Sequence, residues 1–320
     1  MTPDQQPDPS RVSHLRVSPE RAGQRIDNFL LSLLKGVPRA HVYRIVRRGE
    51  VRVNRGRVSA GYRLREGDTV RVPPVRRRLP GNDAPPPELA DQLAGRILYA
   101  DDQVLVLDKP AGMPVHGGTG VPFGVIEVMR ALRPREGYLE LAHRLDRQTS
   151  GCLLLARRRE ILTALHRAFR QGECDKGYLL LARGHWRGGE TTVRASLDES
   201  GRIQGERHVR VADSGRGATT RFRPLALYRL DGELATLVEA RPDTGRMHQI
   251  RVHAAHAGHP LAGDRRYGDP GFNRRLRGVG LRRLFLHAHE LALPASADWH
   301  FSAPLAPDLV ALLERMEEIT

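Results

Sequence analysis

The sequence predicts an α+β protein of two domains, a small basic domain followed by a larger one. Residues 11–80 hold 18 Lys and Arg against 5 Asp and Glu, a net charge of +13 out of +15 for the whole chain. Residues 73–87 contain six prolines, which oppose regular structure and indicate a linker. Beyond them, strand-like and helix-like segments do not alternate regularly, which favours a mixed, mostly antiparallel sheet.

The basic domain has the pattern helix, helix, strand. Its first helix is predicted by apolar residues at helical spacing, namely Ile26, Phe29, Leu30, Leu33 and Leu34. Pro38 suits the start of a second helix and Gly49 its end. A turn at residues 54–56 and a strand at 69–72 complete the domain. Such a density of positive charge is typical of nucleic-acid binding. We assign this role to Arg39, Arg44, Arg47, Arg48 and Arg52.

The larger domain is predicted to mix short strands with amphipathic helices. Apolar runs at 104–107 and 153–155 indicate strands, whereas apolar residues at helical spacing indicate helices near 125–132, 162–169 and 309–316. The expected organisation has four parts: a disordered tail at 1–14, the basic domain at 15–75, a proline-rich linker at 76–95, and the larger domain at 96–320.

The composition narrows the class of protein. No apolar run approaches the ~18 residues of a membrane span, and the N-terminus lacks the basic start and apolar stretch of a signal peptide. The two cysteines, Cys152 and Cys174, make no disulfide framework. We therefore expect a cytoplasmic protein with a polyanionic partner. Nothing in the sequence implies a membrane or an obligate protein partner.

The most distinctive segment is HRLDRQTSG at 143–151, between two predicted strands. It places Asp146 in a connecting loop, flanked by Arg144 and Arg147. A buried carboxylate is costly unless it is paired. These residues alone leave two interpretations open, a structural salt bridge and a catalytic carboxylate.

Two further segments carry polar residues inside apolar patterns. If TGRMHQIRVH at 244–253 is a strand, Arg246 and His248 lie on one face and Arg251 on the other. Arg251 can then pair with a buried carboxylate, or the strand can simply face solvent. In KGYLLLA at 176–182, Tyr178 begins an apolar strand, where a core aromatic with a solvated hydroxyl is the ordinary interpretation.

These segments together resemble a known family. HRLDRQTSG, KGYLLLARG and TGRMHQIRVH, in this order, are similar to the three signature segments of the RluA-type pseudouridine synthases. Residues 23–72 resemble the small alpha-L RNA-binding module that many of these enzymes carry. The resemblance spans about residues 15–315. The stretches GQRIDNFL, PVHGGTG and FGVIEVMRALRP are most similar to the C-type members, which act on 23S ribosomal RNA.

The resemblance implies a role for each residue. Asp146 matches the catalytic aspartate, and Arg251 matches the arginine that pairs with it. Arg144 matches the arginine that contacts the rearranged RNA, and Tyr178 the tyrosine that packs on the flipped-out base. The implied fold is a pseudouridine synthase domain, and the implied activity is isomerisation of uridine. Because this reaction is redox-neutral, we expect no cofactor. The sequence does not choose between attack of Asp146 on C1′ and removal of the C2′ proton.

Three alternatives remain to be weighed. A zinc site at His248, His253, His256 and His259 would need a closed ligand set, and no cysteine pair accompanies them. We therefore predict no metal. A non-catalytic ribosomal RNA-binding assembly factor would explain the charge, although such a protein gains nothing from an acid in an RNA-facing cleft. An N-glycosidase that releases the base shares the carboxylate chemistry.

Overall fold

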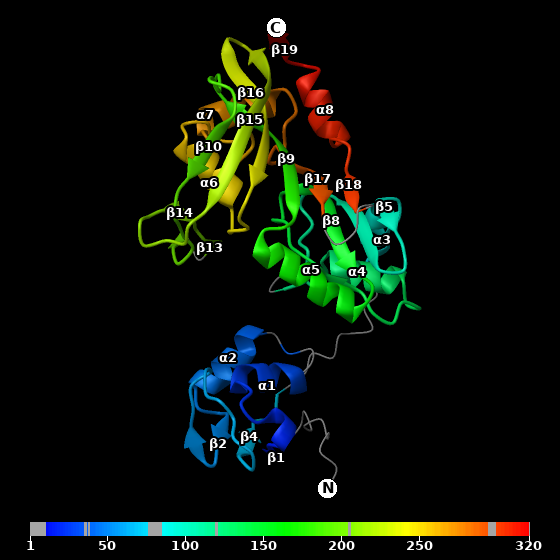
Figure 1. Cartoon of the computed structure of the whole chain (residues 1–320), viewed down its shortest axis with the longest axis vertical. Helices are drawn as coiled ribbons and strands as arrows, with labels where there is room; N and C mark the ends of the chain where they lie inside the picture. The colour runs from blue at the N-terminus through cyan, green and yellow to red at the C-terminus, as the bar shows by residue number, and fades with distance from the viewer. Residues whose placement is uncertain are drawn as a thin grey trace. The chain divides into compact units, whose positions relative to one another are not determined.

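The computed structural model describes residues 11–34, 37, 39–75, 85–118, 121–203, 206–293 and 299–319. The chain divides into two compact units (Figure 1). The first is Met1–Ala84 with Gly118–Gly120, and the second is Pro85–Gly117 with Val121–Thr320. No helix among the described residues is long and apolar enough to cross a membrane.

The first unit contains two helices, a short 3₁₀ turn and a four-stranded sheet of order β1-β4-β2-β3. Its elements are β1 Ser13–Arg16, η1 Pro19–Arg21, α1 Ile26–Leu33, α2 Arg39–Arg47, β2 Arg52–Val53, β3 Gly56–Arg57 and β4 Thr69–Val72. The predicted helices and the strand at 69–72 are confirmed. Most of the predicted tail falls on residues 1–10, outside the described residues. Its last two residues instead belong to β1, because they pair with β4.

The core of this unit follows the apolar spacing. Ile26, Phe29 and Leu30 are buried, as is Leu34 just beyond the helix, while Leu33 is partly buried. The turn between β2 and β3 has two consecutive left-handed residues, Asn54 at φ 48° and Arg55 at φ 69°. This is the backbone of a two-residue hairpin turn, and it matches the right-handed twist of the strands. Gly49 ends α2 at φ 72°.

The second unit is built on one large sheet. Its helices are α3 Pro87–Ala94, α4 Val125–Leu132, α5 Arg159–Gln171, α6 Gln249–His256, α7 Pro270–Gly278 and α8 Pro307–Leu313. The strands of the large sheet are β5 Ile97–Ala100, β6 Val104–Lys109, β7 Glu140–Leu141, β8 Ser150–Ala156, β9 Asp175–Arg183, β10 Thr191–Arg194, β15 Thr219–Leu230, β16 Glu233–Pro242, β17 Leu286–Ala292, β18 His300–Ser302 and β19 Glu317–Ile319. Two small hairpins lie between β10 and β15, formed by β11 Leu197–Asp198, β12 Arg202–Ile203, β13 Glu206–Arg207 and β14 Arg210–Val211.

The main strand order is β10-β15-β16-β9-β17-β8-β6-β5. Strands β8 and β17 pair in parallel, and every other described pair of this sheet is antiparallel. This confirms the predicted α+β class with a mixed, mostly antiparallel sheet. The single parallel pair brings β8, which follows the Asp146 loop, next to the centre of the sheet.

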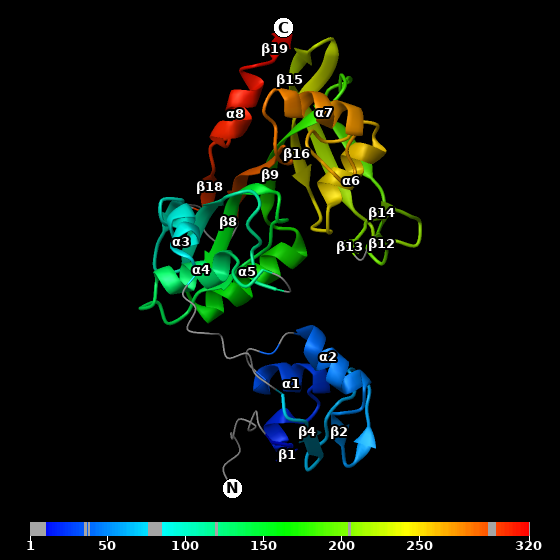
Figure 2. The same cartoon turned by 180° about the vertical axis from the view of Figure 1, so that it is seen from behind.

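Helices cover both faces of the sheet (Figure 2). Alternate residues of β6 and β8 face α3 and α4 on one side and α5 on the other, so residues 104–107 and 152–156 are both buried and apolar. At the other half of the sheet, α6 packs against β15 and β16. The helices α7 and α8 bury a separate apolar cluster that includes Leu181 and Phe285. The packed helices therefore hold the sheet in place, and the sheet supports the loops at its edge.

Two expectations from the sequence are corrected. Helix α3 lies inside the predicted linker at 76–95, because Leu93 is fully buried against α4 and its proline-rich start suits a helix N-terminus. The segment 244–253, treated as a possible strand, leads into helix α6. Every residue from Gln249 to Ala254 is buried. A helix that is enclosed on all sides has no amphipathic pattern that the sequence could reveal.

Candidate active site

A cavity of about 990 Å³ opens beside α6 in the second unit. Its walls come from the loop before β8, the start of β9, the turn before α6 and the hairpin insertion after β10. This volume is at the upper end of the roughly 300–1,000 Å³ typical of ligand clefts. Seven cationic side chains line it: Arg144, Arg170, Lys176, Arg207, Arg216, Arg246 and Arg251. The cavity therefore favours an anionic ligand.

The loop that carries Asp146 is held in place by buried neighbours. His143 is stacked on Phe169 at 5.0 Å, and its Nε2 accepts a hydrogen bond from the Leu154 backbone N–H at 3.0 Å. Burial lowers the pKa of His143 to about 4, so the ring is neutral at pH 7. Leu145 is buried in the core below. The loop is therefore anchored on both sides of Arg144, which itself is exposed.

Lys109 supports the same loop from below. This residue ends β6 and is fully buried. Its ammonium donates to the carbonyl oxygens of Pro110, Met113 and Arg147 at 2.8, 2.9 and 3.3 Å. Burial lowers the pKa of Lys109 to about 7, and the negative charge of Asp146 opposes this shift. The Lys109 side chain thus links β6 to the residue directly after Asp146.

Gly151 explains the end of the segment HRLDRQTSG. It adopts φ 106°, and a Cβ there would lie 2.1 Å from the carbonyl oxygen of Ala288. The close approach occurs where β8 and β17 pair in parallel. Only glycine fits this position without moving the backbone.

Asp146 lies at the cavity with its carboxylate about a quarter exposed, at 24%. Its Oδ2 atom is 3.6 Å from Nη1 of Arg251 and 3.8 Å from Nε2 of His248. The carboxylate is open to the cavity and also within ion-pair distance of Arg251, so the catalytic interpretation of Asp146 stays a prediction.

Arg251 has a different principal partner from the one expected. Its Nε and Nη2 donate to the two carboxylate oxygens of Asp264, both at 2.7 Å, and Asp264 is 1% exposed. The guanidinium also lies over the Tyr267 ring, 4.9 Å from its centroid. Nη1 remains directed at Asp146. Asp264 therefore fixes the guanidinium plane in a two-point contact, and the third nitrogen faces the cavity.

Tyr178 comes to the same cavity from strand β9, as the sequence predicted for the strand itself. Burial raises the pKa of its phenol, and the charge of Asp146 raises it further. Arg144, Asp146, Tyr178 and Arg251 all line this one cavity, although they are up to about a hundred residues apart in sequence. The fold thus brings together the four residues that the resemblance singled out.

Comparison with known proteins identifies the chain. A family model described as RNA pseudouridylate synthase matches residues 103–256, and one described as S4 domain matches residues 24–70. The chain is 48% identical over 313 residues to the ribosomal large subunit pseudouridine synthase C of Haemophilus ducreyi, which covers 96% of each. It belongs to the RNA pseudouridylate synthase family. The enzyme of the same name from Escherichia coli strain K12 is also 48% identical, over 95% of this chain and 97% of that one.

Solved structures of this family have the same fold. Human RNA Pseudouridylate Synthase Domain Containing 1 is 25% identical with a TM-score of 0.60, covering 72% of this chain and 90% of its own. Human RNA Pseudouridylate Synthase Domain Containing 4 is 28% identical with a TM-score of 0.59, covering 72% and 97%. The predicted family and fold of this pseudouridylate synthase are therefore confirmed.

The S4 domain presents the predicted basic residues on its surface. Arg44, Arg47, Arg48 and Arg52 are exposed. Arg39 begins the same helix, and its side chain lies outside the described residues. Arg44 contacts the His41 ring and Arg52 donates to the Gly49 and Arg55 carbonyl oxygens, while these guanidinium groups stay accessible to solvent.

Residues outside the sequence prediction complete this pseudouridylate synthase site. The buried amide of Gln249 accepts from the Thr244 hydroxyl at 2.7 Å and donates to the Thr219 carbonyl at 2.9 Å, which ties the start of α6 to β15. Asp264 and Tyr267 follow the end of α6 by 8 and 11 residues. The only sequence signal for Asp264 and Tyr267 was their position shortly after the segment TGRMHQIRVH. Nothing in that position distinguishes a buried aspartate from an exposed one.

The predicted absence of a metal stays a prediction, and the histidines have other partners. His253 contacts the Thr220 hydroxyl at 3.0 Å, and His259 contacts the Arg183 carbonyl at 2.9 Å. Among the described residues, the one group spaced for a metal ion is Glu239, His289 and Glu290.

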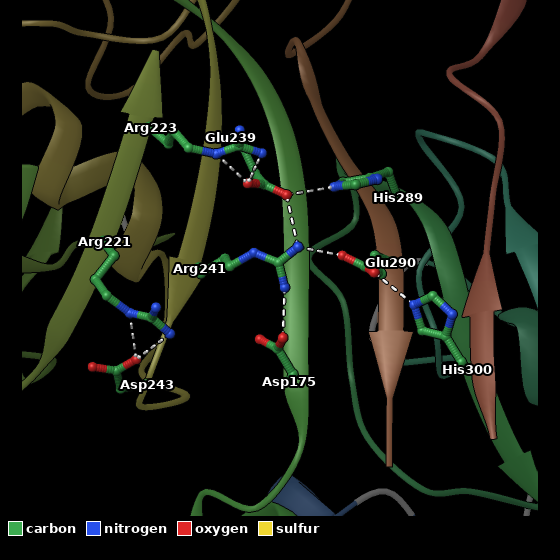
Figure 3. A network of polar contacts seen from close by, with 9 residues as sticks. All are labelled: Asp175, Arg221, Arg223, Glu239, Arg241, Asp243, His289, Glu290 and His300. Atoms are coloured by element: carbon green, nitrogen blue, oxygen red, sulfur yellow. Dashed lines mark hydrogen bonds and ion pairs between the residues drawn. The ribbon is translucent and has the colours of Figure 1, made fainter. Parts of the chain in front are cut away.

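Figure 3 shows that a guanidinium already fills the centre of this group. Arg241 donates to Glu239 at 2.8 Å and to Asp175 at 2.6 Å, and it also pairs with Glu290. Ala240 is the residue paired with Tyr178 in the sheet, so Glu239 and Arg241 point to the opposite face. The network therefore lies behind the sheet, outside the cavity, and braces three adjacent strands.

Proposed function

We propose that this protein converts uridines of large-subunit (23S) ribosomal RNA to pseudouridine, with Asp146 as the catalytic carboxylate. The observation that carries the proposal is the partly exposed Asp146 in a cavity lined by seven cations. Relatives that are about half identical over nearly the whole chain are named for the same reaction class on the large ribosomal subunit. The cytoplasm, where ribosomal RNA is found, is the proposed location.

The chemistry requires one bond to break and another to form. The N1–C1′ glycosidic bond breaks, the base turns within the cavity, and C5 bonds to C1′. The proton on C5 is lost and N1, which carried none in uridine, gains one, so no electrons enter or leave. Asp146 either attacks C1′, in an ester bond that breaks when C5 bonds to C1′, or accepts the C2′ proton, which returns to C2′ when the C5–C1′ bond has formed; Arg251 orients the carboxylate. Tyr178 packs on the flipped base and replaces part of its lost stacking.

The remaining residues act on the RNA rather than on the reacting bond. Arg144 is exposed beside Asp146 and contacts the backbone from which the base has left. The arginines of the S4 domain, with those that line the cavity, neutralise phosphates. This RNA is the proposed partner, and neither a cofactor nor an obligate protein partner is part of the proposal.

The decisive experiment is pseudouridine mapping of ribosomal RNA from cells with and without the protein, complemented by wild type or Asp146→Asn. We expect wild type to restore specific pseudouridines and Asp146→Asn to lower the rate by roughly 10³-fold or more. RNA affinity should change by no more than about twofold, because this carboxylate does not bind phosphate. Asp231→Asn, an exposed change in the β15–β16 turn, is the control.

The same experiment separates the two alternatives. Release of free uracil from the RNA would indicate an N-glycosidase. A mutant Asp146→Asn that supports ribosome assembly as well as wild type, with an unchanged modification map in the deletion strain, would indicate a non-catalytic assembly factor. Either result would contradict the proposal.

A further inference from the structure

A second donor faces the carboxylate of Asp146 alongside Arg251. His248 precedes α6 and lines the cavity, and its Nε2 is 3.8 Å from Oδ2 of Asp146. Its backbone is left-handed, with φ 55°. Non-glycine residues in this region are uncommon, and they concentrate at functional sites. This conformation starts the helix and directs the imidazole towards Asp146.

The hydrogen bonds of Tyr267 decide which ring nitrogen of His248 carries the proton. The Tyr267 oxygen accepts the backbone N–H of Val209 at 3.0 Å. Its own O–H is left to donate, and the hydrogen of a half-buried hydroxyl needs an acceptor. The Nδ1 atom of His248 lies 2.8 Å away. Nδ1 is therefore the acceptor, and the single proton of the neutral ring is on Nε2.

The charge state of His248 agrees with this assignment. Burial lowers the pKa of His248 to about 4, with Arg251 and Arg266 adding to the shift and Asp146 opposing it. Asp264 also lies nearby, but its carboxylate is committed to Arg251. At neutral pH the imidazole is uncharged, and Nε2–H is a donor aimed at the carboxylate without the cost of burying another cation.

We propose that His248 is a positioning residue for the reaction, which donates Nε2–H to Oδ2 of Asp146 in the tautomer that Tyr267 fixes. The inference rests on the proposed function. Arg251 places a positive charge beside Oδ2, and His248 adds a hydrogen-bond donor that orients the carboxylate. Among the described residues, the other carboxylate oxygen, Oδ1, has no polar partner and remains for the reacting atoms. The present distances of 3.6 and 3.8 Å are long for hydrogen bonds, and the proposal requires that they shorten when substrate is bound.

Two conservative variants test the two ring nitrogens of His248 separately, Nε2 facing Asp146 and Nδ1 facing Tyr267. In His248→Gln the terminal amide takes the place of Nε2 and keeps a donor near Asp146. In His248→Asn the shorter amide takes the place of Nδ1, keeps the contact with Tyr267 and removes the donor. Asparagine also tolerates the left-handed backbone, so the variant is expected to fold. His256→Asn, an exposed change at the end of the same helix, is the control.

The measurement is kcat and KM on ribosomal RNA for these full-length variants, with thermal unfolding recorded for each. We expect His248→Asn to lower kcat about tenfold with KM nearly unchanged, since one hydrogen bond to a charged group is removed. His248→Gln should stay within about threefold of wild type. Tyr267→Phe should lower kcat, and adding it to His248→Asn should cost nothing more, because both act through the same donor.

Equal rates for His248→Asn and His248→Gln, or a wild-type kcat for His248→Asn, would overturn the inference. So would additive losses for Tyr267→Phe and His248→Asn. The proposed function fails in a different way, through a fully active Asp146→Asn measured in the same assay. An active wild type and an inactive Asp146→Asn, with all His248 variants unaffected, would reject only the role of His248.

Discussion

Arg251 has two carboxylate partners, because one edge of its guanidinium binds Asp264 and the remaining nitrogen faces Asp146, and we propose that the first contact serves stability and the second serves the chemistry. We predict that Arg251→Leu lowers the free energy of unfolding by about 3–5 kcal/mol, since the buried Asp264 is left without its partner. Activity should fall in the order wild type, Arg251→Lys, Arg251→Leu, because lysine keeps the charge but not the two-point contact. Chemical denaturation and rate measurements check both parts.

A double variant separates the two roles. Arg251→Leu with Asp264→Asn removes both buried charges and keeps an oxygen that can accept from the backbone N–H groups of Arg266 and Tyr267, so part of the lost stability should return while the rate stays low. Arg315→Leu, a surface change, should leave the rate unaffected. A rate near wild type for Arg251→Leu would mean that the contact with Asp146 has no catalytic effect.

At the scale of elements, the polar network behind the sheet joins β9, β16 and β17 (Figure 3). Burial by itself would raise the pKa of Glu239, yet the hydrogen bonds from Arg241 and Arg223 outweigh it and lower the pKa to about 2. A carboxyl with a lowered pKa stabilises the fold above its unfolded value, near 4.5, and this contribution is lost as pH falls towards 2.

We therefore predict that Glu239→Gln loses about 2–3 kcal/mol of stability at pH 7. The difference from wild type should shrink as the pH falls from about 4.5 towards 2. Urea denaturation across this pH range measures it, with the exposed Glu190→Gln as the matched control. A constant difference at all pH values would indicate that Glu239 acts through packing instead of charge.

At the scale of the whole molecule, the charge is divided unequally between the two units. Residues 11–80 carry a net +13 of the total +15. We predict that deleting residues 1–84 weakens RNA binding and flattens its dependence on salt, by about one unit of slope for each phosphate that the protein no longer neutralises. The second unit should still fold, because its apolar clusters are its own. An unchanged slope in a salt titration would contradict this role of the S4 domain.

The reaction itself should need no metal. Isomerisation is redox-neutral, and the metal-like group behind the sheet is occupied by Arg241. We predict that treatment with a chelator leaves kcat unchanged in a buffer whose ionic strength and monovalent salt keep the RNA folded. Loss of activity in this buffer that returns on adding a transition metal, but not on adding Mg²⁺, would contradict the prediction and identify a metal requirement of the protein.

Local sequence determined a large part of this protein. Apolar spacing located α1, α4, α5 and α8, Pro38 and Gly49 indicated the bounds of α2, and the charge of the N-terminal segment marked it as a separate RNA-binding domain. The segment HRLDRQTSG placed Asp146 in a loop between two strands. These features depend on neighbouring residues, because helix spacing, turns and charge density act over a few positions.

Only the tertiary structure decided the rest. Residues 249–256 form a helix although the sequence around them alternates in polarity. Burial from Gln249 to Ala254 and the contact of the Gln249 side chain with Thr244 favour this helix. Asp264 became the main partner of Arg251, and Tyr267 selected the tautomer of His248, through contacts between segments that sequence spacing does not relate. Desolvation, ion pairing and tautomer depend on how a site is assembled in space. The sequence therefore indicated Asp146 as the candidate carboxylate, and the fold determined which residues contact it.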